Sequence, residues 1–270
     1  MQSALAPVLL ERILSRLGID TPSIDRAGLD ALYQAWCHNV PFDNGRKRLA
    51  LVRGEPGPLP GGDPDSFFRF WLEHGASGTC WPSGNALHAL LVSCGFDVRR
   101  VSASMFDIGT HNHGSVIARV DGREVLVDSS MLTDAVLELT PGAAFDTGHG
   151  LHRVLGDPQE AGWLLSFPSP HSGDLVPCRL LDDPVSEAFY LERYEVSRKE
   201  SPFNAFFYAR RNGEGRSVVF LGQTRVVRGA DGIEQQELEG DALEGALAED
   251  LGYSADFIDE LLREGVLGSP

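Results

Sequence analysis

Apolar positions recur at helical spacing through the first third of the chain. Residues 8–17 carry leucine and isoleucine at intervals of three and four, which predicts an amphipathic helix. The same spacing predicts a helix over residues 25–36, opened by an aspartate suited to capping, and another over residues 65–72. Residues 54–65 are rich in glycine and proline and predict a loop. A fourth helix is predicted over residues 82–95, with a proline in its first turn and a glycine at its end.

The pattern changes after Gly95, where short valine-rich runs alternate with turn residues. Residues 98–105, 115–120 and 124–127 predict strands. Asp121-Gly122 separates the last two and is a strong signal for a two-residue hairpin turn. Further strands are predicted over residues 163–167, 175–180, 205–209, 217–221 and 224–227, and further helices over 241–251 and 254–262. Helices followed by a block of strands indicate an α+β fold rather than a parallel doubly wound sheet.

Composition then narrows the functional classes. The 270 residues are 42% hydrophobic and 23% charged, which is typical of a globular protein with a sizeable core. The net charge of −16 supplies no basic footprint for nucleic acid and opposes binding to anionic membranes. No apolar run approaches the roughly 20 residues that span a bilayer, and the first residues lack a secretory pattern, so we expect a cytoplasmic protein. Four widely spaced cysteines without CxxC pairs indicate free thiols.

Cys80 is the strongest candidate for chemistry, because the chain has no P-loop, GxGxxG or HExxH motif. It lies between the Gly/Ser-rich residues 75–79 and the helix predicted to start near Pro82. A helix N-terminus has free N–H groups and partial positive charge, so it favours a thiolate and can hold an oxyanion. The alternative is a small buried apolar residue, a role that suits Cys37 and Cys94 better.

The predicted hairpin indicates a base for this cysteine and a group to orient that base. With a turn at Asp121-Gly122, Val120 pairs with Arg123, and paired residue numbers sum to 243. His113 and Asp128 then project from one face of the hairpin as diagonal neighbours, roughly 7–8 Å apart at the backbone. A carboxylate reaches an imidazole from that position. A nucleophile, a base and an orienting group are the parts of a catalytic triad.

Two other interpretations of these residues stay open. His113 is also compatible with a solvated position at a strand end, with Asp128 as a turn former. Alternatively, His111, His113 and Asp128 form a metal site, although the sequence places no fourth ligand. We expect no metal.

Five motifs in the same order resemble those of the arylamine N-acetyltransferases. The first two are Val40-Pro41-Phe42-Asp43-Asn44, similar to (I/V)-P-F-(E/D)-N, and Gly78-Thr79-Cys80-Trp81, similar to the Gly-x-Cys-aromatic nucleophile motif. The others are the strand that starts at His113, Leu126-Val127-Asp128, and Ser201-Pro202-Phe203-Asn204. The likeness spans residues 8–260.

The resemblance implies a Cys–His–Asp triad made of Cys80, His113 and Asp128, on a core like that of cysteine proteases. It also implies three lobes that agree with the order of predicted elements. Residues 1–95 form a helical bundle that carries the nucleophile, residues 96–190 an antiparallel β-barrel that carries the histidine and aspartate, and residues 191–270 an α/β lid.

The chain departs from the family pattern close to the triad. The family's Arg-Gly-Gly-x-Cys-x-Glu reads here as Ala76, Ser77, Gly78, Cys80 and Pro82. The arginine and glutamate pair with each other in the family, and losing both is less damaging than leaving one charge alone. After Asp128, the family's Gly-Phe-Gly is replaced by Ser130, Met131 and Leu132, and Pro202 replaces a histidine. We therefore expect a divergent relative whose acceptor differs from a simple arylamine.

The resemblance implies a cysteine-dependent acyltransferase with ping-pong kinetics. An acetyl or larger acyl group passes from a thioester to Cys80 and then to a small-molecule amine. The donor is acyl-coenzyme A or, in amide synthase-like relatives, an acyl carrier protein thioester; it is a co-substrate, and no bound cofactor is expected. The rivals are a cysteine hydrolase or transglutaminase-like enzyme, a metal-dependent enzyme and a non-catalytic binding protein.

Aromatic and flexible apolar side chains near the motifs are the candidates for the substrate pocket, although ordinary core positions explain them equally well. These are Phe42, Trp81, Phe106, Met131 and Phe203, followed by Phe206 and Phe207.

Overall fold

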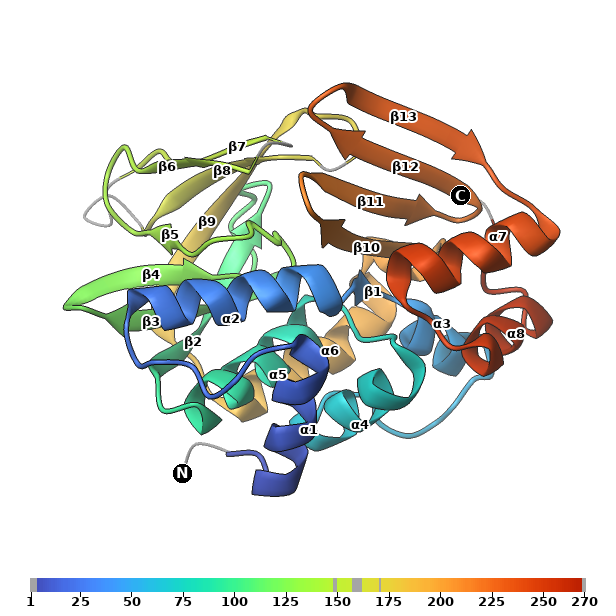
Figure 1. The fold of residues 1–270 in the computed structure, drawn as a ribbon, viewed down its shortest axis with the longest axis horizontal. Coiled ribbons are helices and arrows are strands. Elements are labelled where there is room, and N and C mark those ends of the chain that lie inside the picture. The colour runs from blue at the N-terminus through green and yellow to red at the C-terminus, as the bar shows by residue number, and fades with distance from the viewer. Residues whose placement is uncertain (1–3, 148–149, 157–161, 170, 269–270) are drawn as a thin grey trace.

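Two antiparallel sheets lie side by side over a layer of helices (Figure 1). The computed structural model describes residues 4–147, 150–156, 162–169 and 171–268. Within these residues one sheet has eight strands in the order β5-β4-β3-β2-β9-β8-β7-β6 and forms a nearly closed barrel. The other has five strands in the order β1-β10-β11-β12-β13. The predicted α+β fold, with N-terminal helices, a central antiparallel barrel and a mixed C-terminal unit, is confirmed.

The helices before the barrel follow the predicted pattern, with one addition. They are α1 (Pro7–Leu17), α2 (Arg26–Asn39), α3 (Gly45–Val52), α4 (Pro64–His74) and α5 (Cys80–Ser93). Asp25 caps α2 as predicted, because its side chain accepts a hydrogen bond from the backbone of Gly28. The helix α4 is capped by Asp63 rather than opened at Asp65. The short helix α3 was not predicted, and α5 begins two residues earlier than expected, at Cys80 itself.

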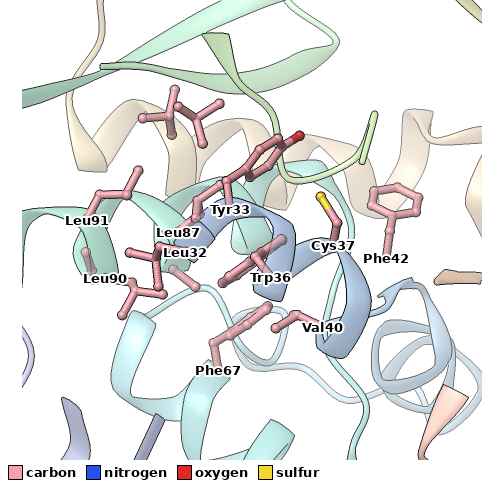
Figure 2. Packing of buried hydrophobic residues seen from close by; sticks show 14 of the residues in the cluster. Leu32, Tyr33, Trp36, Cys37, Val40, Phe42, Phe67, Leu87, Leu90 and Leu91 are labelled. Carbon is pink, nitrogen blue, oxygen red and sulfur yellow. The ribbon is translucent and has the colours of Figure 1, made fainter. Parts of the chain in front are cut away.

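The helix α5 runs through the middle of the helical layer and is buried on every side over its first three turns. Figure 2 shows Trp36 of α2 packed beside Phe67 of α4, with Leu87, Leu90 and Leu91 of α5 next to them. The rings of Trp36 and Phe67 are stacked, with centroids 6.1 Å apart. This packing fixes the position of the helix whose first residue is the candidate nucleophile.

The barrel contains the hairpin predicted from the sequence. Its strands are β2 (Asp97–Met105), β3 (His113–Val120), β4 (Arg123–Val127), β5 (Leu137–Glu138), β6 (Ala144–Asp146), β7 (Leu151–Val154), β8 (Leu164–Pro168) and β9 (Leu175–Pro184). Val120 pairs with Arg123, so the predicted register of β3 and β4 is confirmed. Asp121 and Gly122 both have positive φ, as a tight two-residue hairpin turn requires. The short strands β5, β6 and β7 were not predicted.

The last third of the chain supplies four of the five strands of the second sheet and the helices that cover it. Its elements are α6 (Glu187–Glu200), a 3₁₀ turn (Pro202–Asn204), β10 (Tyr208–Gly213), β11 (Arg216–Leu221), β12 (Thr224–Gly229), β13 (Gly232–Glu237), α7 (Gly240–Ala246), a π turn (Leu247–Leu251) and α8 (Ala255–Arg263). The strand predicted over 205–209 starts later, because the 3₁₀ turn precedes it. The helix predicted over 241–251 ends its α-helical part at Ala246. The boundary predicted at residue 190 falls inside α6, and the division into three lobes stays a prediction.

The two-residue strand β1 (Phe42–Asp43) connects the N-terminal helices to the C-terminal sheet. Phe42 pairs with Arg210 of β10 on one side and forms a parallel bridge with Gly78 on the other. The backbone N–H of Asp43 donates to the carbonyl of Gly78, at 3.2 Å. The segment before Cys80 is therefore joined through β1 to the five-stranded sheet.

Candidate active site

The hairpin brings His113 and Asp128 into direct contact. His113 is the first residue of β3, and Asp128 follows directly after β4. Nε2 of His113 lies 2.8 Å from Oδ2 of Asp128, and both side chains are buried, with residue exposures of 4% and 1%. The contact predicted from the hairpin register is thus present.

Asp128 is held from two further directions. Its Oδ1 accepts hydrogen bonds from the backbone N–H groups of Ser130 and Met131, both at 2.8 Å. The Tyr33 hydroxyl of α2 donates to its backbone carbonyl at 2.6 Å. Burial alone raises the pKa of a carboxyl group, but the charge of His113 and these hydrogen bonds lower the pKa of Asp128. Asp128 is therefore an anchored carboxylate at neutral pH.

The imidazole of His113 is placed between this carboxylate and Cys80. Burial disfavours its charged form, but the charge of Asp128, the hydrogen bond to it and an interaction with the Cys80 side chain outweigh burial and raise the pKa of His113 to about 10. Because Asp128 occupies Nε2, the remaining ring nitrogen Nδ1 faces Cys80. The ring thus carries both protons at neutral pH.

Cys80 lies at the first position of α5 with 9% of its surface exposed. The first hydrogen bond of this helix runs from Ser83 N–H to the Thr79 carbonyl, at 3.0 Å. The backbone N–H groups of Cys80 and Trp81 come before this bond, so they have no carbonyl partner within the helix, and Pro82 has no N–H. Two backbone donors are therefore free at the end of the helix that carries Cys80, and donors of this kind can stabilise the oxyanion that forms when a thiolate attacks a carbonyl carbon.

The loop before Cys80 is anchored by Asp43, a role that sequence reasoning missed. Its carboxylate accepts from the backbone N–H of Ser77 at 2.7 Å and of Gly45 at 3.0 Å. The Ser77 hydroxyl also bonds to the carbonyl of Pro41. Burial raises the pKa of Asp43 to about 6 despite these bonds. Asp43 and Ser77 hold the loop in a chain that lacks the family's arginine and glutamate. The Val-Pro-Phe-Asp-Asn motif was the sequence feature that could have indicated this anchoring role of Asp43.

The other cysteines lie in environments that disfavour a thiolate. Burial raises the pKa of Cys94 to about 11, and burial also raises the pKa values of Cys37 and Cys178. None of the four cysteines forms a disulfide. This agrees with the expectation of free thiols and with the inert roles expected for Cys37 and Cys94.

The described residues surround a cavity of about 840 Å³ that reaches Cys80 and His113. All five residues predicted to line the substrate pocket lie on its wall: Phe42, Trp81, Phe106, Met131 and Phe203. Phe206 lines it as well, whereas Phe207 is fully buried in the core between the five-stranded sheet and the C-terminal helices. Phe207 thus takes the ordinary core position that the sequence left open, on the opposite face of the sheet from the cavity.

The residues of the metal alternative do not form one ligand set. Nδ1 of His111 lies 2.8 Å from the Ser102 hydroxyl, and its ring packs edge-on against Phe189. In the part of the chain that the structure describes, no three histidine, cysteine, aspartate or glutamate side chains are grouped as in a metal site. Across those same residues, no helix is both long and apolar enough to cross a bilayer.

The cavity wall also contains Arg210 of β10 and Arg193 of α6, which sequence reasoning did not single out. Nothing in their sequence context distinguishes them from the other arginines of the chain. Their placement follows from how β10 and α6 pack.

Comparisons with known proteins place this geometry in a known fold. No family model matches the chain, and no curated protein sequence does. Among solved structures, an arylamine N-acetyltransferase from Salmonella typhimurium matches with a TM-score of 0.80 and 16% identity, covering 96% of this chain and 98% of that one. The enzyme from Mycobacterium smegmatis matches with a TM-score of 0.79 and 18% identity, covering 96% of this chain and 98% of that one. An arylamine N-acetyltransferase from Bacillus cereus, described as having a Cys-His-Glu catalytic triad, matches with a TM-score of 0.76 and 15% identity. The match covers 93% of this chain and 100% of that one.

The chain thus has the arylamine N-acetyltransferase fold, the fold of a class of cysteine acyltransferases, with a strongly diverged sequence. The resemblance found in the sequence motifs is confirmed at the level of the fold.

Proposed function

We propose that this protein is a cysteine-dependent N-acyltransferase in which Cys80, His113 and Asp128 act as the triad. The proposal rests on one observation: the buried Asp128–His113 pair interacts with the side chain of Cys80, which lies at the N-terminus of α5. The fold comparisons support the same class of chemistry.

The first half-reaction transfers the acyl group to the enzyme. In the resting protein the Cys80 thiol proton already lies on Nδ1 of His113, and Asp128 stabilises this thiolate–imidazolium pair. The thiolate attacks the carbonyl carbon of an acyl thioester, and the N–H groups of Cys80 and Trp81 stabilise the oxyanion. The C–S bond of the donor breaks, and the leaving thiolate takes the proton from His113. The products are acyl-Cys80 and the free donor thiol.

The second half-reaction releases the acyl group. Neutral His113 removes a proton from an amine as its nitrogen attacks the acyl carbon, and collapse of the intermediate breaks the C–Sγ bond. The amide leaves, and Cys80 and His113 return to the thiolate–imidazolium pair. A cavity of about 840 Å³ has room for more than an acetyl group and a small amine. Acyl-coenzyme A is the proposed donor, and a carrier-bound acyl group with amide synthase chemistry is the alternative.

Intact-protein mass spectrometry after brief incubation with acetyl-coenzyme A, longer acyl-coenzyme A esters and an acyl carrier protein thioester tests this function. We expect a mass gain equal to the acyl group in the wild type and in Cys94→Ala, and none in Cys80→Ala. Release of the adduct by an amine, but not by water alone, distinguishes a transferase from a cysteine hydrolase. No adduct with any of these donors would refute the proposal and favour a non-catalytic role.

A further inference from the structure

The position of Arg210 in the five-stranded sheet directs its side chain towards the cavity. Residues two apart on a strand share a face, so Arg210 lies on the face of Tyr208, which also lines the cavity. Ala209 and Phe207 lie on the other face, in the core that α7 and α8 cover. Arg210 pairs directly with Phe42, another residue of the cavity wall. The sheet therefore presents this guanidinium to the space in front of Cys80.

The charge of Arg210 is buried without a matching anion. The residue is 5% exposed, and no ion pair among the described residues includes it. Its Nη1 lies 3.5 Å from the Ser130 carbonyl and its Nη2 3.4 Å from Oδ1 of Asn212, both longer than a normal hydrogen bond, and its Nε has no partner. By contrast, Nε of Arg225 on the next strand but one lies 2.6 Å from Asp250. Buried arginines are normally paired, because an isolated charge in a protein interior is costly.

A second unpartnered polar group lies beside Arg210. The Ser130 hydroxyl is buried without a hydrogen-bond partner, and Ser130 lines the cavity. Ser130 is also the residue whose backbone N–H holds Asp128 and whose carbonyl faces Arg210. A hydroxyl donor next to a guanidinium fork matches an oxyanion with two oxygens in one plane.

We propose that Arg210, assisted by the Ser130 hydroxyl, binds a carboxylate on the amine acceptor. This inference rests on the proposed acyltransferase function. Strands in a sheet lie about 4.8 Å apart, and Phe42 separates Arg210 from Gly78, so the backbone of Arg210 lies roughly 10 Å from the nucleophile loop. Arg210 and Cys80 both line the cavity, so the class of acceptor expected is a small molecule that carries an amine at one end and a carboxylate at the other, such as an amino acid or an aminobenzoate. A phosphate of the thioester donor has the same oxyanion chemistry and is the competing ligand.

Binding measurements test the site without requiring turnover. Isothermal titration compares benzoate with neutral benzamide, and with 3′,5′-ADP as a probe for donor phosphates, on the wild type, Arg210→Met and Arg211→Met. Arg211 is the matched control because it projects from the opposite face and donates to the carbonyl of Glu249. We expect Arg210→Met to weaken benzoate binding by roughly 10- to 100-fold, with benzamide and 3′,5′-ADP unaffected and Arg211→Met behaving like the wild type. Arg210→Lys keeps a charge without the fork and should recover part of the affinity.

Transfer rates then connect the site to the reaction. After acylation of Cys80, we expect 4-aminobenzoate to react faster than 4-aminobenzamide in the wild type, and this preference to disappear in Arg210→Met. Equal benzoate affinity in the wild type and Arg210→Met, or no benzoate binding at all, would overturn the proposal. If Arg210→Met lost affinity only for 3′,5′-ADP, the proposal would be overturned too, and Arg210 would be assigned to binding the thioester donor. Benzoate binding that depends on Arg210 in a protein that never acylates would refute the proposed function and leave the carboxylate site standing.

Discussion

Asp128→Asn is the substitution that most directly tests how the triad works. The asparagine Oδ1 keeps the hydrogen bonds from the backbone of Ser130 and Met131, so the loop stays in place. Its amide N–H₂ then faces Nε2 of His113, where the carboxylate oxygen was. In this variant a neutral His113 ring must accept the amide hydrogen bond at Nε2 and carry its own proton on Nδ1, the nitrogen next to Cys80. The base is then in the wrong tautomer to take the thiol proton.

The magnitude follows from the environment of His113. Its pKa of about 10, against an ordinary value near 6.5, corresponds to roughly 5 kcal/mol of net stabilisation of the imidazolium. Burial works against that charge, so removing the Asp128 charge leaves burial as the main influence and the pKa of His113 falls below its ordinary value. We expect the rate of Cys80 acylation to fall by about 10³- to 10⁴-fold, as for the same change in serine protease triads.

Quenched-flow mass spectrometry of acyl-Cys80 formation measures this rate, and the pH dependence of Cys80 alkylation by iodoacetamide reports the thiolate. Asp134→Asn serves as the control, since Asp134 accepts from Asn212 at 2.8 Å and lies outside the triad. Acylation within tenfold of the wild type, in an Asp128→Asn protein whose fold is unchanged by circular dichroism, would refute the role given to Asp128.

Three further outcomes follow from buried contacts. Tyr33→Phe removes a hydroxyl that bonds to the Asp128 carbonyl and accepts from the backbone N–H of Thr133, and should lower the free energy of unfolding by about 1–3 kcal/mol in urea titrations. Gly114→Ala places a methyl 2.7 Å from Cε3 of Trp81 and should slow Cys80 acylation by about tenfold or more, measured by mass spectrometry. Folding raises the pKa of His113, so between about pH 6.5 and 10 the folded state holds a proton that the unfolded chain releases. The contribution of His113 to the free energy of unfolding is therefore complete below pH 6.5 and is lost as the pH rises towards 10, which denaturant titrations at several pH values measure.

Each of these outcomes has a comparison that can contradict it. An unfolding free energy of Tyr33→Phe within about 0.5 kcal/mol of the wild type would show that the hydroxyl is not needed. Gly57→Ala meets no atom within 4 Å and should acylate normally; equal slowing in both alanine variants would remove the steric explanation. A pH slope that persists in His113→Gln would belong to other groups.

The parts of the site that depend on local pattern could be predicted from the sequence. The turn Asp121-Gly122 and the valine alternation set one register, and that register alone brings His113 and Asp128 together. The glycine-rich segment followed by Pro82 indicated that Cys80 lies near a helix start, although the structure moves that start to Cys80 itself. These are short-range effects of backbone preference and side-chain period.

Elements stabilised by distant contacts escaped prediction. Half of the residues of α6 are charged. The helix is held by Tyr190, whose hydroxyl donates to carbonyls of β2 and β3, and by Tyr194, whose hydroxyl donates to the carbonyl of Pro60. The edge strand β13 is exposed along its whole length and carries no apolar alternation. Arg210 and Arg211 are adjacent arginines, and only the pairing of β10 decides which one faces the cavity.

The two residues of β1 also make the order of synthesis matter. Asp43 and Cys80 leave the ribosome early, but Arg210 of β10, the partner of Phe42, lies 168 residues further along the chain (210 − 42). At typical translation rates of about 5–20 residues per second, that strand follows on the order of ten seconds later. During this interval the nucleophile loop lacks the sheet that supports β1 from the other side. A nascent chain therefore carries Cys80 well before it can complete the cavity around it, and release of the C-terminal third is the step that completes the cavity wall.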